Sequence, residues 1–551
     1  MLKTGPNTAL WLESILRTGY DRAGAAGQKI TLNPVRFEPN AEDMPNRVKN
    51  DHRPGFSRLR IARVINEYGG ETVVRYAAPT GQCATGQGLP GKSDTALLKA
   101  NNRLCYPSYW HPDPAVEEID WFHKYVVESV QELPNVLGAY PTVTSYAYSG
   151  AAWRLAEAEF SKKSTRTYSQ FAGVAQTTVL SGTENASIGS RQTKSVTRYF
   201  QGLGDDVSVK DSAGQEIAKD REPFAGRVAE DLTYASASDT DWLTRSVTYP
   251  QAIELASRSR GDDLPPLRAW RILEPRQKSW ARSSGTGDDT RTIRSVETRT
   301  TFDPVYGLPT FIESLGDDGK TGDESCTSTT YYHQTDRNLI GLTKEMLASP
   351  TLCADATWSN LTSLAGGGRT SYDGQAFGVA PGNTSRGLVT ETFSLKADGT
   401  GFQSGGTTAF DAIGRVISST DVDGKKSEIS YTPDTGQAFR TTSRNSLGHS
   451  QTQEVEPGRA VTLKTTDLNG QVSEARFDAL GRLIERGRRA GPRPRRRCRT
   501  SRRCIRRRRV HRRTSRRTRA GTRTRPRSRS RCTTVSGVNA SRRRKRSAAA
   551  V

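Results

Sequence analysis

The chain has 551 residues, of which 34% are hydrophobic and 7% aromatic, and it contains 50 Gly and 26 Pro. This composition argues against long packed helices and favours many short elements joined by turns. The formal charge is +24, but residues 486–551 hold 29 of the 82 basic residues and no acidic one, which leaves 53 basic against 58 acidic residues, about −5, in residues 1–485. The high overall charge therefore describes the C-terminal tail and says nothing about the main body.

Targeting signals are the first feature to consider at the N-terminus. The opening residues, MLKTGPNTALWLES, lack the apolar core of a signal peptide, and we find no apolar run long enough to cross a membrane. As written, the chain is predicted to be cytoplasmic and to have no membrane span. If it is part of a longer exported protein, we expect it to be secreted or displayed on the cell surface.

Short strand-like runs fill the N-terminal region, which we delimit as residues 1–290. Residues 10–300 show no helical stripe sustained over several turns. Gly, Asn, Asp or Pro separate the runs, as is typical of strands joined by turns. The clearest runs are Arg58–Tyr68, Glu71–Ala78, Thr142–Gly150, Ala175–Gly182, Ser195–Gly202 and Thr244–Pro250. One helix is predicted over Ala151–Lys163 from its helical propensity and from Leu155 and Glu159, four residues apart.

Four of the seven cysteines lie in the main body as two local pairs. Cys83 and Cys105 are 22 residues apart, and Cys326 and Cys353 are 27 apart. No CxxC pair is present, so a zinc site is not predicted. Two local disulfides in an oxidising compartment and four unpaired, half-buried thiols are the two alternatives, because connectivity does not follow from sequence.

Candidate catalytic and ligand-binding groups are few. The histidines are scattered, and His111, His123, Asp113 and Glu117 are better interpreted as a polar strand edge than as a hydrolytic site. The turns at 421–424 and 316–319 resemble the start of calcium loops but lack the later ligands. We predict no catalytic residue, metal or cofactor. Five aromatic residues fit core packing of a thin β-layer or, alternatively, a sugar-stacking surface: Trp110, Trp121, Tyr146, Tyr148 and Trp153.

A repeat of just over twenty residues follows a degenerate region that we place at residues 291–389. FDAIGR begins at Phe410 and FDALGR at Phe477. An aromatic or aliphatic residue near an acidic one recurs at spacings of 21, 24 and 22, and the glycines between recur at 24 and 22. Two markers with one period indicate stacked supersecondary units over residues 390–485. The residues that define the repeat are Phe410, Asp411, Gly414, Arg415, Gly424, Tyr431, Gly448, Gly470, Phe477, Asp478, Gly481 and Arg482.

The local chemistry of each unit predicts a β-hairpin. Asp423-Gly424 and Asn469-Gly470 are dipeptides that accept positive φ in tight turns. Asp411 and Asp478 suit hydrogen bonding to backbone N–H groups of the turn. A single hairpin is marginal in water, so neighbouring units must stack to bury their aromatic face.

These phrases resemble the YD repeats of RHS-repeat proteins. Upstream phrases at Trp121–Val127, Phe302–Thr310 and Thr370–Pro381 resemble the actinobacterial branch of that family, whose members include polymorphic toxins and wall-associated proteins. The resemblance implies an all-β fold, a ribbon of β-hairpins that forms part of a spiral shell. It also implies a non-enzymatic role: to enclose or present a toxin or surface domain. The chain leaves the repeat near Glu485 without the self-cleaving core or toxin of complete members, so we expect an incomplete fragment.

The tail, residues 486–551, is predicted to be disordered because it cannot bury apolar area. Its residue types, nearly all Arg among the charges, are those of a GC-rich coding strand translated out of frame, so we interpret it as a frameshift product; a selected polyanion-binding arm is the alternative. Expected partners are the rest of a longer RHS protein or a toxin cargo. Carbohydrate or cell-wall binding is the first alternative function, and nucleic-acid binding through the tail is the second.

Overall fold

The structure is a computed structural model that describes residues 3–4, 7–8, 10–20, 29–41, 44–49, 51–185, 189–261, 263–283 and 291–489. The chain divides into two units, Met1–Gly491 and Pro492–Val551, and all described residues belong to the first. The expected disordered tail therefore lies, from residue 490 on, outside the described residues. Its first residues, 486–489, belong to the last strand of the sheet.

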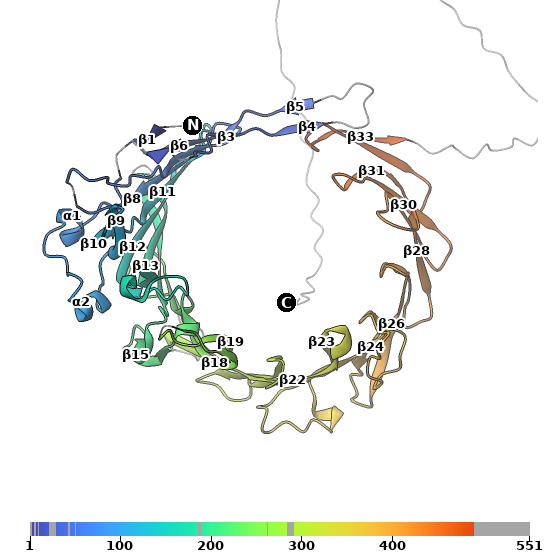
Figure 1. Ribbon diagram of the computed structural model, residues 1–551. Helices are drawn as coiled ribbons and strands as arrows, with labels where there is room; N and C mark the ends of the chain where they lie inside the picture. Colours follow the sequence, from blue (N-terminus) through green and yellow to red (C-terminus); the bar gives the residue numbers. More distant parts are fainter. Residues whose placement is uncertain are drawn as a thin grey trace, which may run out of the picture. The chain divides into compact units, whose positions relative to one another are not determined.

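One antiparallel sheet runs through the first unit, and each of its strands is hydrogen-bonded to the next one in the sheet. The colours of Figure 1 follow this order from β6 to β33, so neighbours in sequence are neighbours in the sheet. The strands are β3 (Ser14–Ile15), β6 (Val35–Pro39), β7 (Ile61–Ile65), β8 (Glu71–Tyr76), β11 (Val127–Leu133), β12 (Thr142–Arg154), β13 (Gln170–Asn185), β14 (Gly189–Tyr199), β17 (Val228–Tyr234), β18 (Thr244–Arg258), β19 (Leu267–Arg282), β20 (Ile293–Phe302), β21 (Pro309–Asp317), β22 (Ser325–Gln334), β23 (Leu339–Ser349), β24 (Gly366–Tyr372), β25 (Val389–Leu395), β26 (Phe402–Phe410), β27 (Val416–Thr420), β28 (Lys426–Thr432), β29 (Arg440–Arg444), β30 (Ser450–Glu456), β31 (Val461–Thr466), β32 (Val472–Phe477) and β33 (Leu483–Arg489).

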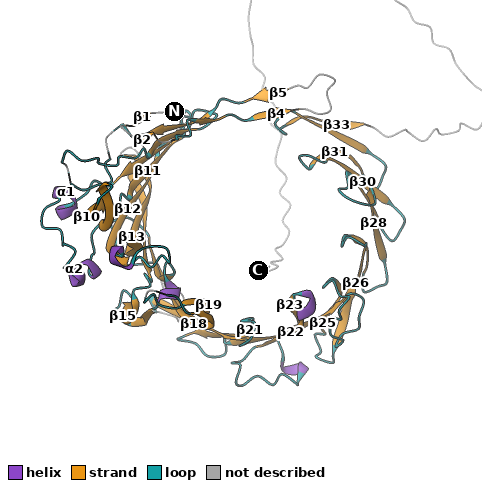
Figure 2. Ribbon diagram, viewed as in Figure 1, coloured by secondary structure: helices purple, strands orange, loops and turns teal. Residues whose placement is uncertain are grey.

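The remaining elements are four small hairpins and a few short helical turns, as Figure 2 shows by colour. The hairpins pair β1 with β2, β4 with β5, β9 with β10, and β15 with β16. Their bounds are Lys3–Thr4, Asn7–Thr8, Thr18–Tyr20, Lys29–Thr31, Cys105–Asp113, Val116–His123, Gly204–Lys210 and Glu216–Asp220. The helices are α1 (Gly81–Thr85), α2 (Thr95–Lys99) and single 3-10 turns at Lys163–Thr165, Glu222–Phe224, Thr335–Arg337 and Leu361–Ser363. The predicted all-β hairpin ribbon is confirmed.

Two edges remain on the sheet. β3 pairs only with β6, and β33 pairs only with β32; within the described ranges no strand pairing joins β3 to β33. Unpaired N–H and C=O groups at such an edge are a template for another strand. Leu483 and Ile484 on β33 are 55% and 64% exposed, which adds apolar surface to this edge.

Buried side chains gather in the N-terminal two thirds of the sheet. One cluster comprises Phe200, Ile217, Phe224, Ala229 and Val247, where the β15–β16 hairpin covers β17 and β18. From residue 389 to residue 487, by contrast, Ala479 is the single buried apolar residue among those described. The repeat region is therefore one layer thick, and strand pairing and turns contribute more there than a core does.

The helix predicted over Ala151–Lys163 is wrong. Ala151–Arg154 continue β12, where Ala151 pairs with Val174 and Trp153 with Phe171 on β13. The Trp153 ring lies 4.7 Å from Tyr106 and 4.9 Å from Phe171. This packing outweighs a helical propensity that is worth only tenths of a kcal/mol per residue.

Candidate functional site

The repeat is built around one turn geometry, shown by Asp478. Its Oδ1 accepts hydrogen bonds from the backbone N–H groups of Leu480 and Arg482, both at 2.9 Å. Its carbonyl accepts from the N–H of Gly481 at 2.9 Å, and Gly481 has φ of 80°. A side chain with a Cβ is strained at this φ, so glycine is strongly favoured.

The same turn recurs at six other positions, four in the repeat region and two in the N-terminal body. In every case the first residue is Asp or Asn, its side chain accepts from the N–H groups two and four residues on, and the glycine three residues on has positive φ. The other six turns are Asn66–Gly69, Asp211–Gly214, Asp411–Gly414, Asp421–Gly424, Asn445–Gly448 and Asp467–Gly470. Gly424, Gly448 and Gly470 thus occupy equivalent bends, and the turn extends beyond the repeat found in the sequence.

Arginine completes the two FDxxGR copies. Arg415 Nε donates to Asp411 Oδ2 at 2.6 Å, and Arg482 Nε donates to Asp478 Oδ2 at 2.7 Å. The pKa of the Asp478 carboxyl is held below its ordinary value by the backbone N–H of Arg482, against burial that raises it, with help from the Arg482 guanidinium. The chemistry that the two copies share is therefore a closed turn rather than a reactive group.

A second set of arginine contacts links one repeat to the next. Arg386 Nη1 donates to the Asp411 carbonyl at 3.1 Å, and Arg459 Nη1 donates to the Asp478 carbonyl at 2.9 Å. Arg415 donates in the same way to the Asp434 carbonyl. Sequence reasoning did not find Arg386 or Arg459. The signal in the sequence is an arginine that lies 25 or 19 residues before the aspartate that begins a turn.

The aromatic repeat residues support this link from the strands. Tyr431 OH donates to the Val416 carbonyl at 2.9 Å, and the Arg415 guanidinium lies 4.3 Å from the Tyr431 ring centre. Phe410 and Phe477 close β26 and β32 immediately before their turns and are half-buried. The arrangement is structural: it fixes the spacing of successive hairpins.

Both cysteine pairs of the main body are disulfide-bonded. Cys83 of α1 joins Cys105 of β9, with 5.9 Å between Cα atoms, and Cys326 of β22 joins Cys353, with 5.1 Å between Cα atoms. Cys83 and Cys105 lie in a buried cluster with Val48, Leu98 and Trp121. This disulfide ties α1, which has no place in the sheet, to the β9–β10 hairpin.

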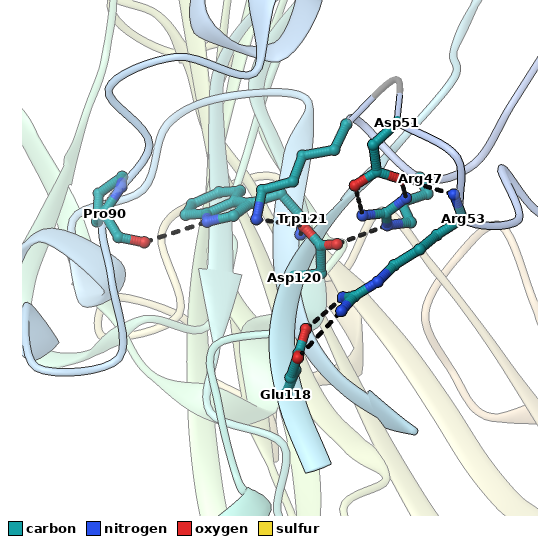
Figure 3. Close-up of polar contacts among 8 residues, drawn as sticks. Arg47, Asp51, Arg53, Pro90, Glu118, Asp120 and Trp121 are labelled. Carbon is teal, nitrogen blue, oxygen red and sulfur yellow. Dashed lines mark hydrogen bonds and ion pairs between the residues drawn. The ribbon is translucent and has the colours of Figure 1, made fainter. Parts of the chain in front are cut away.

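A buried ion-pair network holds the same region, which we call the disulfide module (residues 44–125). The Arg47 side chain is fully buried, and its Nε donates to Asp120 Oδ2 at 2.6 Å while Nη1 and Nη2 donate to the Asp51 carboxylate at 2.5 and 2.7 Å (Figure 3). The Arg47 guanidinium, first among several causes, holds the pKa of Asp51 far below its ordinary value. Sequence reasoning missed this network because its members lie up to 73 residues apart.

Hydrogen bonds around the network join further segments of the disulfide module. Arg53 reaches Glu118 on β10 at 2.5 Å, and Trp121 Nε1 donates to the Pro90 carbonyl at 3.1 Å (Figure 3). The buried Arg47–Asp120 pair is costly to break because the charge that remains loses its nearest opposite charge. The network therefore sets the position of β10 relative to residues 44–53.

The positions of the five aromatic residues argue against a sugar-stacking surface. Trp121 and Trp153 are buried, and Tyr148 OH donates to the Val127 carbonyl at 2.9 Å. Trp110 packs edge-on against Phe56, and Tyr146 stacks against Tyr148. For these residues the packing interpretation holds.

The histidine and carboxylate candidates do not converge on a reaction centre. His111 Nε2 lies 3.6 Å from Glu117 Oε1 across the β9–β10 hairpin, whereas His123 is half-buried and burial lowers its pKa. Within the ranges that the structure describes, no three His, Cys, Asp or Glu side chains are placed to hold a metal ion. No helix among those residues is long and apolar enough to span a membrane.

Comparisons with known proteins show which solved structures have a similar fold. No protein-family model and no curated protein matches the chain. Solved structures do match: "TcdB2-TccC3-Cdc42" with TM-score 0.52 at 12% identity, "TcdB2-TccC3-TEV" with 0.52 at 13%, and the Photorhabdus luminescens Tc holotoxin pore with 0.51 at 12%. Each match covers 78% of this chain and 24% of the other chain.

The strand ladder, the repeated turns and these structural matches together define the fold class. The chain has the β-hairpin fold of an RHS-type shell. The particular proteins that it is similar to are the TcdB2-TccC3 chains, at an identity that shows the fold alone. The chain spans about a quarter of their length.

Proposed function

We propose that residues 10–489 form part of the wall of an RHS-type shell that encloses or presents a toxin or surface domain, with no catalytic role of their own. The observation that carries this proposal is the uninterrupted antiparallel ladder from β6 to β33, in which each hairpin is completed by its neighbours. A ladder of this kind extends by adding hairpins and needs no compact core. We also propose that the chain belongs to the actinobacterial branch of RHS-repeat proteins and serves in a polymorphic-toxin or wall-associated protein.

Exposed apolar side chains of the repeat region support an incomplete wall. Large apolar residues on or beside the single-layer sheet remain more than a third exposed, and a monomer rarely leaves so many in one region. They are Ile413, Ile417, Val422, Phe439, Leu447, Leu463, Leu468, Leu483 and Ile484. In a complete shell, further segments of the longer protein or its cargo would cover part of this surface.

The two disulfides support folding outside the reducing cytoplasm. Cys105 and Cys326 are 0% and 1% exposed, so both bonds are sheltered parts of the fold. Structural disulfides form and persist in oxidising compartments. We therefore propose that the working protein is secreted or displayed on the cell surface.

Protease protection tests the shell function. The chain is expressed together with the coding segments that flank it, and the folded product is treated with proteinase K. Enclosure predicts that a segment outside residues 10–489 survives in the folded product and is cleaved after unfolding in urea. Equal cleavage before and after unfolding would contradict enclosure.

A further inference from the structure

A groove of about 560 Å³ lies where α2, the end of β12 and the β15–β16 hairpin meet. Figure 1 shows α2 and β15 beside β12 and β13, and the groove residues come from all of these elements. The volume falls within the range of small-molecule sites. None of these residues takes part in the repeat turns, the disulfides or the Arg47 network.

The walls of the groove are fixed by hydrogen bonds. Asp220 is 2% exposed, and its carboxylate accepts from the backbone N–H groups of Gln201, Gly202 and Leu203 at 2.8, 2.8 and 3.1 Å. Gln201 Nε2 also donates to the Gly150 and Gly173 carbonyls at 2.9 and 3.0 Å. The loop that forms one wall is thus tied to β12 and β13.

A second part of the lining is held by Arg260. Its guanidinium donates to the Glu157 carbonyl at 3.1 Å, to Glu157 Oε2 at 3.2 Å and to the Pro265 carbonyl at 2.6 Å. Glu157 and Pro265 both line the groove, and Glu157 is already paired. Fixed walls lower the ordering cost that a ligand would meet.

Arg154 is the unusual member of the lining. Its backbone pairs with Gln170 in the sheet, but its side chain makes no hydrogen bond or ion pair with any described residue, and its Nε is closed off from solvent without a partner. A partly buried guanidinium without an acceptor is costly, and a carboxylate in the groove satisfies its terminal N–H groups with strong, often bidentate, charge-assisted bonds. Around Arg154 the lining is largely apolar, with Ala96, Trp153, Leu155, Leu203 and Val207 among its residues.

The remaining charges limit the ligand. Lys99 adds one positive charge to the lining, and Asp206 and Glu222 add two negative charges. A ligand with several negative charges would be repelled by these carboxylates, whereas a single carboxylate can be held by Arg154. We propose that the groove binds a small monocarboxylate with an apolar body, its carboxylate on Arg154 and its body against Trp153 and Leu155.

Calorimetric titration of the full chain with 4-phenylbutyrate and with its neutral isostere 4-phenylbutyramide tests this assignment. Wild type is expected to bind the carboxylate about tenfold more tightly than the amide. Arg154→Gln removes that preference and leaves amide binding within about twofold. Arg268→Gln, on an exposed arginine outside the groove that pairs with Glu254, retains the preference.

A second variant protects the test against misfolding. Ala96→Trp fills the groove from an exposed position on α2 and is expected to abolish binding of both probes while the melting temperature stays unchanged. Equal binding of the two probes to wild type, or tight carboxylate binding in a folded Arg154→Gln or Ala96→Trp variant, overturns the assignment. Binding of an acidic peptide without binding of 4-phenylbutyrate overturns it as well.

Discussion

Asp478 is bound by Arg482 through both of its carboxylate oxygens: the backbone N–H reaches Oδ1 at 2.9 Å and the guanidinium Nε reaches Oδ2 at 2.7 Å. The same two bonds join Asp411 to Arg415, at 2.9 and 2.6 Å. The spacing of four residues from Asp to Arg in FDxxGR therefore spans one turn. The phrase is repeated because the same backbone conformation is repeated. This relationship makes the turn glycines the most direct place to test the fold.

Gly470→Ala should lower the free energy of unfolding by about 1–2 kcal/mol, because Gly470 has φ of 74° and alanine is strained there. No atom lies within 4 Å of the added methyl group, so a steric clash contributes nothing. The measurement is urea unfolding followed by circular dichroism. Gly487→Ala, also in open space but without positive φ, is the control and should be neutral or stabilising. Equal effects of the two substitutions would contradict the turn assignment.

Arg47→Met should destabilise the disulfide module by about 3–5 kcal/mol, because the buried Asp120 carboxylate loses its nearest positive charge and keeps only the Lys49 ammonium at 3.7 Å. Hydrogen exchange measured by mass spectrometry should rise in residues 44–125 and remain unchanged in the repeat region. A double variant with Asp120→Asn should recover part of the loss. An Arg53→Met change, in a half-exposed pair with Glu118, is the control and should cost much less. Uniform exchange across the chain would show that the module is not a separate unit of stability.

Loss of the Cys83–Cys105 bond, by the paired substitutions Cys83→Ser and Cys105→Ser, should cost about 2–4 kcal/mol. The physical reason is that the bond closes a loop of 22 residues in the unfolded chain. Differential scanning calorimetry with and without dithiothreitol measures the effect. Wild type should melt lower in the reductant, and a further double change at Cys326 and Cys353 should abolish that dependence. A reductant-independent wild type would contradict the presence of the bonds in solution.

Acid should weaken the sheet through Glu297. The Arg276 guanidinium, against burial and with help from Arg299, holds the pKa of Glu297 below its ordinary value of 4.5. Because the folded pKa is the lower one, the stabilisation is complete above pH 4.5 and is lost as the pH falls through the folded pKa. Glu297→Gln should therefore flatten the fall of melting temperature between neutral pH and acid. Glu254→Gln, in an exposed pair with Arg268, serves as the control and should leave the fall unchanged.

The edge strand β33 should promote self-association of the chain on its own. Ile484→Lys places a charge on the exposed edge and should raise the monomer fraction measured by size-exclusion chromatography with light scattering. Val422→Lys, on an exposed turn residue away from the edge, is the control and should leave the fraction unchanged. A wild-type chain that is already monodisperse and melts cooperatively as a monomer would contradict the prediction.

The repeat region is where sequence and structure agree best. Period-two runs and Gly turns predicted strands, and β26 alternates between half-buried and exposed residues along its whole length. In the N-terminal body, the predicted runs Glu71–Ala78 and Thr142–Gly150 correspond to β8 and β12. Local hydrogen bonding decides these features, so a short window of sequence contains them.

The amino-acid sequence by itself determined the hairpin ribbon and its turns, because an Asp or Asn, a glycine three residues later and alternating side chains act within a few residues of one another. Only the tertiary structure decided that Ala151–Arg154 form a strand, that Arg47 lies between Asp51 and Asp120, and that Arg154 faces a groove without a partner. These features depend on segments brought together across tens of residues, where packing and burial outweigh local preference. The pairing of Cys83 with Cys105 belongs to the same class, because it requires a Cα separation that spacing along the chain does not specify.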